Sequence, residues 1–143
     1  MTIPERFLTQ RNRLFSFVGT SLLSITGWKV TGQIPDVKKL LVVLAPHTSN
    51  WDFVYGMALI LSLKIKLYWL GKHSIFKKGV TRLLKSLGGI PVNRENARNT
   101  INDVLEIAQR EGGILIGLSP EGTRKKAEKW KSGFLRMAKS MEC

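Results

Sequence analysis

Short apolar runs alternate with stretches of helical periodicity from Gly32 onward, and few folds accept that pattern. It predicts an α/β fold with a mostly parallel or mixed sheet flanked by helices. The run at residues 40–45 is continuously apolar, which is typical of a strand covered on both faces. Further strands are expected at residues 67–70, 90–92 and 114–118.

Two helices are predicted between these strands. The first covers residues 52–63. The second lies between the last two strands, and Gly112-Gly113 supplies its stop signal. Five apolar residues form its buried stripe: Ala97, Ile101, Val104, Leu105 and Ala108.

The composition favours anionic binding partners but does not identify which one the protein binds. The 143 residues, 43% of them apolar, suffice for one globular domain with a core. A formal charge of +13 favours an anionic partner, such as nucleic acid, a phospholipid surface or a phosphorylated metabolite. The single cysteine, Cys143, excludes an internal disulfide and a cysteine-based metal cluster.

The segment 1–28 contains a predicted amphipathic helix at residues 14–28. Its apolar face is made by Leu14, Val18, Leu22 and Ile25, with Phe15 and Phe17 beside it, and three arginines precede it: Arg6, Arg11 and Arg13. This pattern fits a helix lying in a membrane interface and equally a helix packed on a core; a signal peptide is disfavoured. Lys64 and Lys66 interrupt the longest apolar stretch, residues 53–71, so we expect no membrane span.

His47 and Asp52 follow the first predicted strand and begin the helix after it. A neutral imidazole accepts a proton from an alcohol when a carboxylate holds its other nitrogen as a donor. General-base assistance of this kind contributes roughly 100- to 10,000-fold in rate. A structural explanation stands beside this one. Ser49 and Asp52 also fit a capping box, in which both side chains satisfy amides at the helix start.

The other candidate residues follow other predicted strands. Arg94 follows the third strand, and the turn Pro120-Glu-Gly-Thr-Arg124 follows the fourth. Because parallel strands end at one edge, where ligands bind in open α/β sheets, we expect these groups to converge with His47. The guanidinium of Arg124 suits phosphate recognition, and the backbone at Gly122 suits close approach of a ligand. A plain turn with exposed charges is the simpler explanation of this motif.

Basic residues dominate the middle of the chain. Between Asp52 and Glu95 there are eight and no acid: Lys64, Lys66, Lys72, Lys77, Lys78, Arg82, Lys85 and Arg94. A solvated basic face is the commonest reason for such a run, and it also attracts phosphate-bearing substrates and anionic lipid. Nucleic acid is not expected, because the basic residues are not interleaved with aromatic residues in a stacking motif.

Taken together, the motifs resemble the glycerophospholipid acyltransferase family, which includes the 1-acyl-sn-glycerol-3-phosphate acyltransferases. His47 and Asp52 are similar to the family's first motif, Gly89-Ile-Pro-Val-Asn-Arg94 to its second, and Ser119-Pro-Glu-Gly-Thr-Arg124 to its third. Lys131-Ser-Gly-Phe134 is similar to the segment after it. The resemblance covers residues 28–137, and three motifs in order are far more specific than one.

The resemblance implies a glycerol-3-phosphate acyltransferase-like domain at residues 29–143. His47 would deprotonate a glycerol hydroxyl, which attacks the thioester of acyl-CoA or acyl carrier protein, while Asp52 orients the ring. Acceptor binding would fall to six residues: Arg94, Glu121, Gly122, Thr123, Arg124 and Lys131. No metal and no bound cofactor are expected. The acceptor would be a lysophospholipid or glycerol phosphate, and the protein would be a peripheral membrane enzyme on the cytoplasmic side.

The chain departs from the family pattern in ways that bear on the acceptor. Asn93 stands where the family often has aspartate, Ser119 where it has a large apolar residue, and Lys125 where it has serine. The chain also ends at Cys143, before the proline-containing strand of the fourth motif, so we expect a C-terminally truncated domain. Two other functions remain open: a catalytically silent membrane-binding module, and a hydrolase that activates water against an ester or thioester.

Overall fold

The computed structural model describes residues 2–47, 49–93, 96–122 and 129–143. The chain divides into two compact units. The helical unit comprises Met1–Val37 and Thr48–Lys66, and the sheet unit comprises Lys38–His47 and Leu67–Cys143. His47 and Asp52 therefore belong to different units, and each unit is described by itself. The predicted boundary between residues 28 and 29 stays a prediction.

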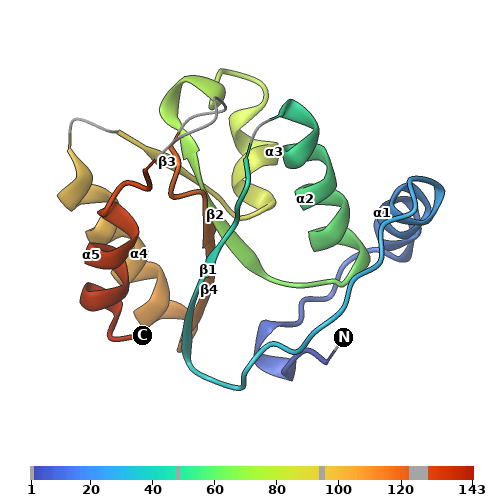
Figure 1. Ribbon diagram of the computed structural model, residues 1–143, viewed down its shortest axis with the longest axis horizontal. Coiled ribbons are helices and arrows are strands. Elements are labelled where there is room, and N and C mark those ends of the chain that lie inside the picture. Colours follow the sequence, from blue (N-terminus) through green and yellow to red (C-terminus); the bar gives the residue numbers. More distant parts are fainter. Residues whose placement is uncertain (1, 48, 94–95, 123–128) are drawn as a thin grey trace. The chain divides into compact units, whose positions relative to one another are not determined.

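The sheet unit contains four parallel strands in the order β1-β4-β2-β3 (Figure 1). They are β1 (Lys39–Val43), β2 (Leu67–Lys72), β3 (Gly89–Val92) and β4 (Ile114–Leu118). The helices of this unit are η2 (His73–Ile75), α3 (Thr81–Ser86), α4 (Ala97–Glu111) and α5 (Gly133–Met141). The predicted α/β class is confirmed.

The strands are buried to different degrees. Every residue of β4 is buried, because β4 lies between β1 and β2. The residues of β1 are all partly buried, without alternation between the two faces, so the 40–45 run is less buried than the prediction implied. The reason is that β1 is an edge strand with a single neighbour, β4, among the described strands. A continuous apolar run therefore did not distinguish an edge strand from a central one.

Alternation of side chains gives the sheet two different faces. On one face, α4 and α5 pack on β3 and β4 and form the main core. This core contains Ile90, Val104, Ala108, Ile114, Ile116, Leu118, Met137 and Met141. On the other face, Trp69 of β2 stacks on Phe76 with ring centroids 6.0 Å apart, and its indole donates to the Leu87 carbonyl beyond α3 at 3.0 Å. Helices α3 and α4 thus cover opposite faces (Figure 1).

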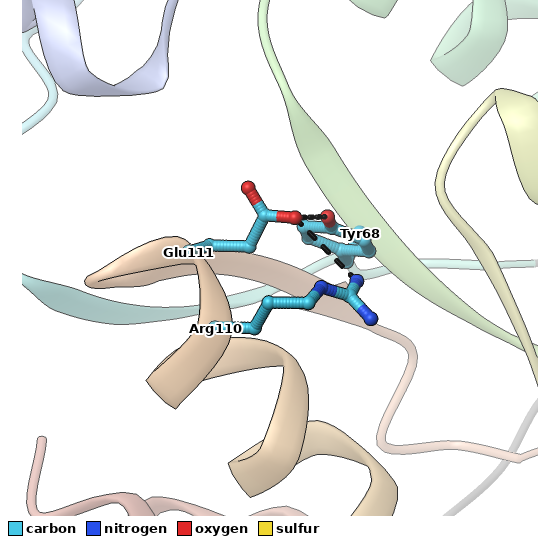
Figure 2. Close-up of polar contacts among 3 residues, drawn as sticks. All are labelled: Tyr68, Arg110 and Glu111. Carbon is cyan, nitrogen blue, oxygen red and sulfur yellow. Dashed lines mark hydrogen bonds and ion pairs between the residues drawn. The ribbon is translucent and has the colours of Figure 1, made fainter.

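The amino edge of the sheet is marked by a small polar cluster (Figure 2). Glu111 ends α4 and is followed by Gly112 in a left-handed conformation, the stop that the sequence predicted. Its carboxylate accepts from the Tyr68 hydroxyl at 3.3 Å and from Arg110 at 3.4 Å. Because α4 ends here just before β4 begins, this cluster lies at the opposite edge from the carboxyl ends of the strands.

The helical unit is built on two helices, α1 (Arg13–Ile25) and α2 (Asn50–Ser62), and the short η1 (Glu5–Phe7). The helices approach closely at Gly19, where a Cβ atom would lie 2.6 Å from the Ala58 carbonyl oxygen and 2.8 Å from the Ser62 nitrogen. Thr20 and Ser62 share a hydrogen bond of 2.9 Å between their hydroxyls. No described helix is long and apolar enough to cross a membrane.

The face of α1 turned away from this contact is apolar and exposed. Gly19 and Leu23 are buried, whereas the predicted apolar face points outward. Phe17 is 69% exposed and Ile25 is 84% exposed, and Leu14, Phe15 and Val18 are also exposed. Within the described residues, this arrangement disagrees with a helix whose apolar face packs on a core. Helix α1 packs on α2 through Gly19 and Leu23, and the membrane-interface alternative stays a prediction.

Gly88 permits the tight entry into β3. Its φ of +87° lies in the left-handed region, and an added Cβ would collide with the carbonyl oxygen of Leu67 in the neighbouring strand. Backbone atoms cannot move aside as a flexible side chain can. We expect Gly88→Ala to lower the free energy of unfolding by about 2 kcal/mol, measured by urea denaturation.

A matched control lies in the same unit. Gly133 begins α5, and a Cβ there meets nothing within 4 Å among the described atoms. Gly133→Ala should change the free energy of unfolding by less than about 0.5 kcal/mol. Equal stability of the two variants would contradict the role assigned to Gly88.

Candidate active site

His47 lies just beyond the carboxyl end of β1 and is half-buried. Pairing with β4 continues past the strand end, since the Leu44 amide donates to the Leu118 carbonyl at 2.9 Å. The Ala45–Pro46 peptide bond is cis. The His47 amide then donates to Oε2 of Glu121 at 3.0 Å, so a side chain continues the ladder where β4 turns away.

The turn after β4 brings three predicted site residues together. Glu121 is buried, at 7% exposure, and its carboxylate faces the His47 amide. Gly122 has a φ of +60°, and a Cβ there would lie 3.3 to 3.4 Å from the last side-chain atoms of Lys131. The Lys131 amide donates to the Pro120 carbonyl at 2.9 Å, which fixes this lysine beside the turn.

These contacts confirm the expected convergence for one pair, His47 and the turn after β4. His47, Glu121, Gly122 and Lys131 meet at the carboxyl edge of the sheet. Arg94, Thr123 and Arg124 lie outside the described residues, as does Lys125. The roles assigned to all of these residues stay predictions.

Asp52 forms the capping box that the sequence offered as the structural explanation. Its Oδ2 accepts from the Ser49 amide at 2.6 Å, and the Ser49 hydroxyl accepts from the Trp51 amide at 3.1 Å. Both side chains thus satisfy amides at the first turn of α2. Since Asp52 belongs to the helical unit and His47 to the sheet unit, their pairing stays a prediction.

Exposed cations follow the strand next to β4. From the last residue of β2 onward, five basic residues of the sheet unit are exposed: Lys72, Lys77, Lys78, Arg82 and Lys85. They give this part of the unit a positive surface that attracts anions. Among the described residues, no three His, Cys, Asp or Glu side chains gather as a metal site. Electrostatic attraction for a phosphate is thus the clearest property of this region.

The structure describes two of the residues that depart from the family pattern, Ser119 and Asn93. Ser119 follows β4 directly, and its hydroxyl oxygen is buried without a hydrogen-bond partner among the described residues. Asn93 follows β3 and is exposed. An apolar side chain at position 119 would place no hydroxyl in this buried setting.

Sequence reasoning missed how Glu121 is used. It did not predict that the Glu121 carboxylate is hydrogen-bonded to the backbone of His47, 74 residues away in the sequence, and the acceptor-binding role implied by the resemblance stays a prediction. The signal for such a contact is the adjacency of β1 and β4, and the sequence alone does not give the strand order.

The family model described as Acyltransferase matches residues 27–143 of the chain. The chain belongs to this acyltransferase family. The family contains the 1-acylglycerol-3-phosphate acyltransferases, so the resemblance drawn from the three motifs is confirmed. All eight predicted site residues of this acyltransferase fall within the match. No curated protein and no solved structure matches the chain.

Proposed function

We propose that this acyltransferase moves a fatty acyl group from an acyl thioester to the hydroxyl of a lysophospholipid or glycerol-phosphate acceptor in phospholipid biosynthesis. The donor is acyl-CoA or acyl carrier protein. The observation that carries the proposal is the hydrogen bond between His47 and Glu121, which joins the first and third family motifs at one sheet edge. A base beside a cation-bearing turn is the arrangement that a phosphorylated alcohol requires.

In the proposed reaction, the His47 imidazole accepts the proton of the acceptor hydroxyl. The hydroxyl oxygen attacks the thioester carbonyl carbon, and the tetrahedral intermediate collapses with cleavage of the carbon–sulfur bond. The imidazolium returns its proton to the departing thiolate, so the products are an ester and a free thiol. Asp52 holds the ring in the correct tautomer and favours the imidazolium.

The acceptor phosphate is proposed to bind at the turn after β4. The Lys131 side chain, with its ammonium, lies against Gly122 in this turn. Arg94, Thr123 and Arg124 are the further proposed ligands, by analogy with the motifs. A guanidinium and an ammonium at one site match a phosphate with charge-assisted hydrogen bonds, which are shorter and stronger than neutral ones.

The proposed mechanism predicts that His47 is essential for acyl transfer. Replacing it by alanine should lower acyl transfer by roughly 100- to 10,000-fold, because the general base is lost. The assay follows thiol release and product mass with a panel of lysolipid acceptors. His73, the other histidine, is exposed in η2, and His73→Ala should keep near-normal turnover. Near-normal turnover of His47→Ala would end the general-base proposal. Release of fatty acid without an acceptor would instead indicate a hydrolase.

A second prediction separates the two roles of Asp52. Asp52→Asn keeps an oxygen that can accept from the Ser49 amide but removes the charge. Ser49→Ala disrupts the capping box but keeps the carboxylate. If Asp52 orients the base, Asp52→Asn should lower kcat by roughly 100-fold or more, and Ser49→Ala should cost only about 1 kcal/mol of stability. If Ser49→Ala were as inactive as Asp52→Asn, the loss of activity would come from the lost helix cap, and the orienting role of Asp52 would be contradicted.

We also propose that α1 lies in an anionic membrane surface on the cytoplasmic side. Support comes from the exposed apolar face of α1 and from its lack of acidic residues. Arg13 begins the helix and Arg11 precedes it; burial lowers the pKa of the Arg11 side chain, yet a guanidinium stays charged at neutral pH. An apolar face with cations at one end suits a surface of anionic headgroups, which the cytoplasmic leaflet presents.

The membrane prediction is tested with vesicles of mixed zwitterionic and anionic phospholipid. Phe17→Gln should weaken vesicle binding by roughly tenfold or more, because a buried phenylalanine contributes about 1.5 to 3 kcal/mol and glutamine keeps the helix. Leu135 of α5 is 59% exposed and provides the control, since Leu135→Gln should bind as the parent does. Equal cosedimentation of Phe17→Gln and Leu135→Gln would refute interfacial docking through α1.

A further inference from the structure

We propose that Glu121 is a positioning residue for His47 rather than a ligand of the acceptor. This inference rests on the proposed function, since it gives the carboxylate a part in placing the proposed base. It starts from one hydrogen bond, in which the His47 amide donates to Oε2 of Glu121 at 3.0 Å. Both residues belong to the sheet unit, where β1 and β4 are neighbours.

The bond occurs where regular pairing between the strands has ended. A backbone bond from the Leu44 amide to the Leu118 carbonyl carries the ladder one residue past β1. Pro46 has no amide hydrogen, so it cannot extend the ladder. The His47 amide donates instead, and β4 meets it with a carboxylate because its own backbone turns at Pro120 and Glu121. The position of the His47 backbone is therefore set by the Glu121 side chain.

Burial argues against direct contact between Glu121 and an acceptor. The residue is 7% exposed, and with Thr100 it makes up the buried polar and charged residues among those described. A buried carboxylate needs donors within the protein, because losing water is costly for an ionised group. The His47 amide supplies one, and a bond from a neutral donor to an ionised acceptor is roughly twice as strong as a neutral pair. Little of the Glu121 side chain is therefore exposed at the surface.

The same contact fixes the base relative to the cation beside the turn. Glu121 precedes Gly122, and the Lys131 side chain lies against Gly122. The hydrogen bond thus ties the segment that carries the imidazole to the segment that carries the ammonium. An acceptor with its hydroxyl at one and its phosphate at the other is held at a constant spacing. Loss of this tie should lower kcat more than it weakens acceptor binding, since a displacement of about 1 Å can cost about 100-fold in rate.

Two substitutions distinguish positioning from direct binding. Glu121→Ala removes the acceptor oxygen, whereas Glu121→Gln keeps a carbonyl oxygen that accepts from an amide. We expect Glu121→Ala to lower kcat at least tenfold while KM for lysophosphatidate changes less than about threefold. Glu121→Gln should restore kcat to within about fivefold of the parent. A large rise in KM, or a Gln variant as impaired as the Ala variant, would overturn the proposal.

Hydrogen exchange tests the bond between the His47 amide and Glu121 without any acyl transfer. The His47 amide should be protected in the parent and in Glu121→Gln, and it should exchange at least tenfold faster in Glu121→Ala, followed by two-dimensional NMR. Unprotected exchange in the parent would refute the inference. Should Glu121→Ala fail to fold, Glu121→Gln remains decisive: protection with near-normal kcat supports positioning, and protection with lost kcat overturns it.

The control is Glu111→Ala at the amino edge of the sheet. Glu111 also accepts hydrogen bonds, from Tyr68 and Arg110 (Figure 2). It ends α4 at the amino edge of the sheet, whereas His47 follows the carboxyl end of β1. Its kcat and its His47 protection should match the parent. If protection follows the prediction while the parent transfers no acyl group, the proposed function fails and the positioning contact stands.

Discussion

Insertion of β4 between β1 and β2 is the constraint on which the candidate site depends. It makes β4 the most buried strand and brings its carboxyl end beside that of β1. Parallel pairing then places the segments after these two strands at one edge, and the register Val43 to Leu118 ends both strands at the same level. The Glu121 carboxylate extends that pairing by one more bond, to the amide of His47. The site thus begins where the last backbone hydrogen bond between β1 and β4 ends.

The sequence predicted elements well where strong local signals bounded them. The strand Ile114–Leu118 was predicted to the residue, because two glycines precede it and Ser119-Pro120 follows it. Helix α3, with six residues, is too short for a periodic pattern to emerge among its basic residues. Helix α5 was also missed, although Phe134, Met137 and Met141 recur at helical spacing and pack in the core. The sequence predicted that the turn containing Glu121 converges with His47, but their hydrogen bond depends on the adjacency of β1 and β4, which sequence periodicity does not contain.

Asp52 illustrates why a motif does not decide between two explanations. The capping box is present, so the structural explanation of this residue is confirmed. The cap uses Oδ2, and an ionised carboxylate has two oxygens that together accept several hydrogen bonds. Starting a helix and orienting an imidazole are therefore compatible tasks for one side chain. An aspartate at position 52 suits both helix capping and orientation of the imidazole. The sequence alone therefore could not tell which of the two tasks Asp52 performs.

The donor in the contact between β1 and β4 is the main chain of His47, and this has a consequence for substitution at either end of the contact. Any residue except proline offers the same amide, so exchange of the imidazole for another side chain leaves the contact intact. Substitution at position 121 can therefore remove this contact, whereas any residue other than proline at position 47 keeps its donor. The loop after β1 thus stays attached to the turn after β4 whichever side chain stands at position 47, as long as the glutamate remains.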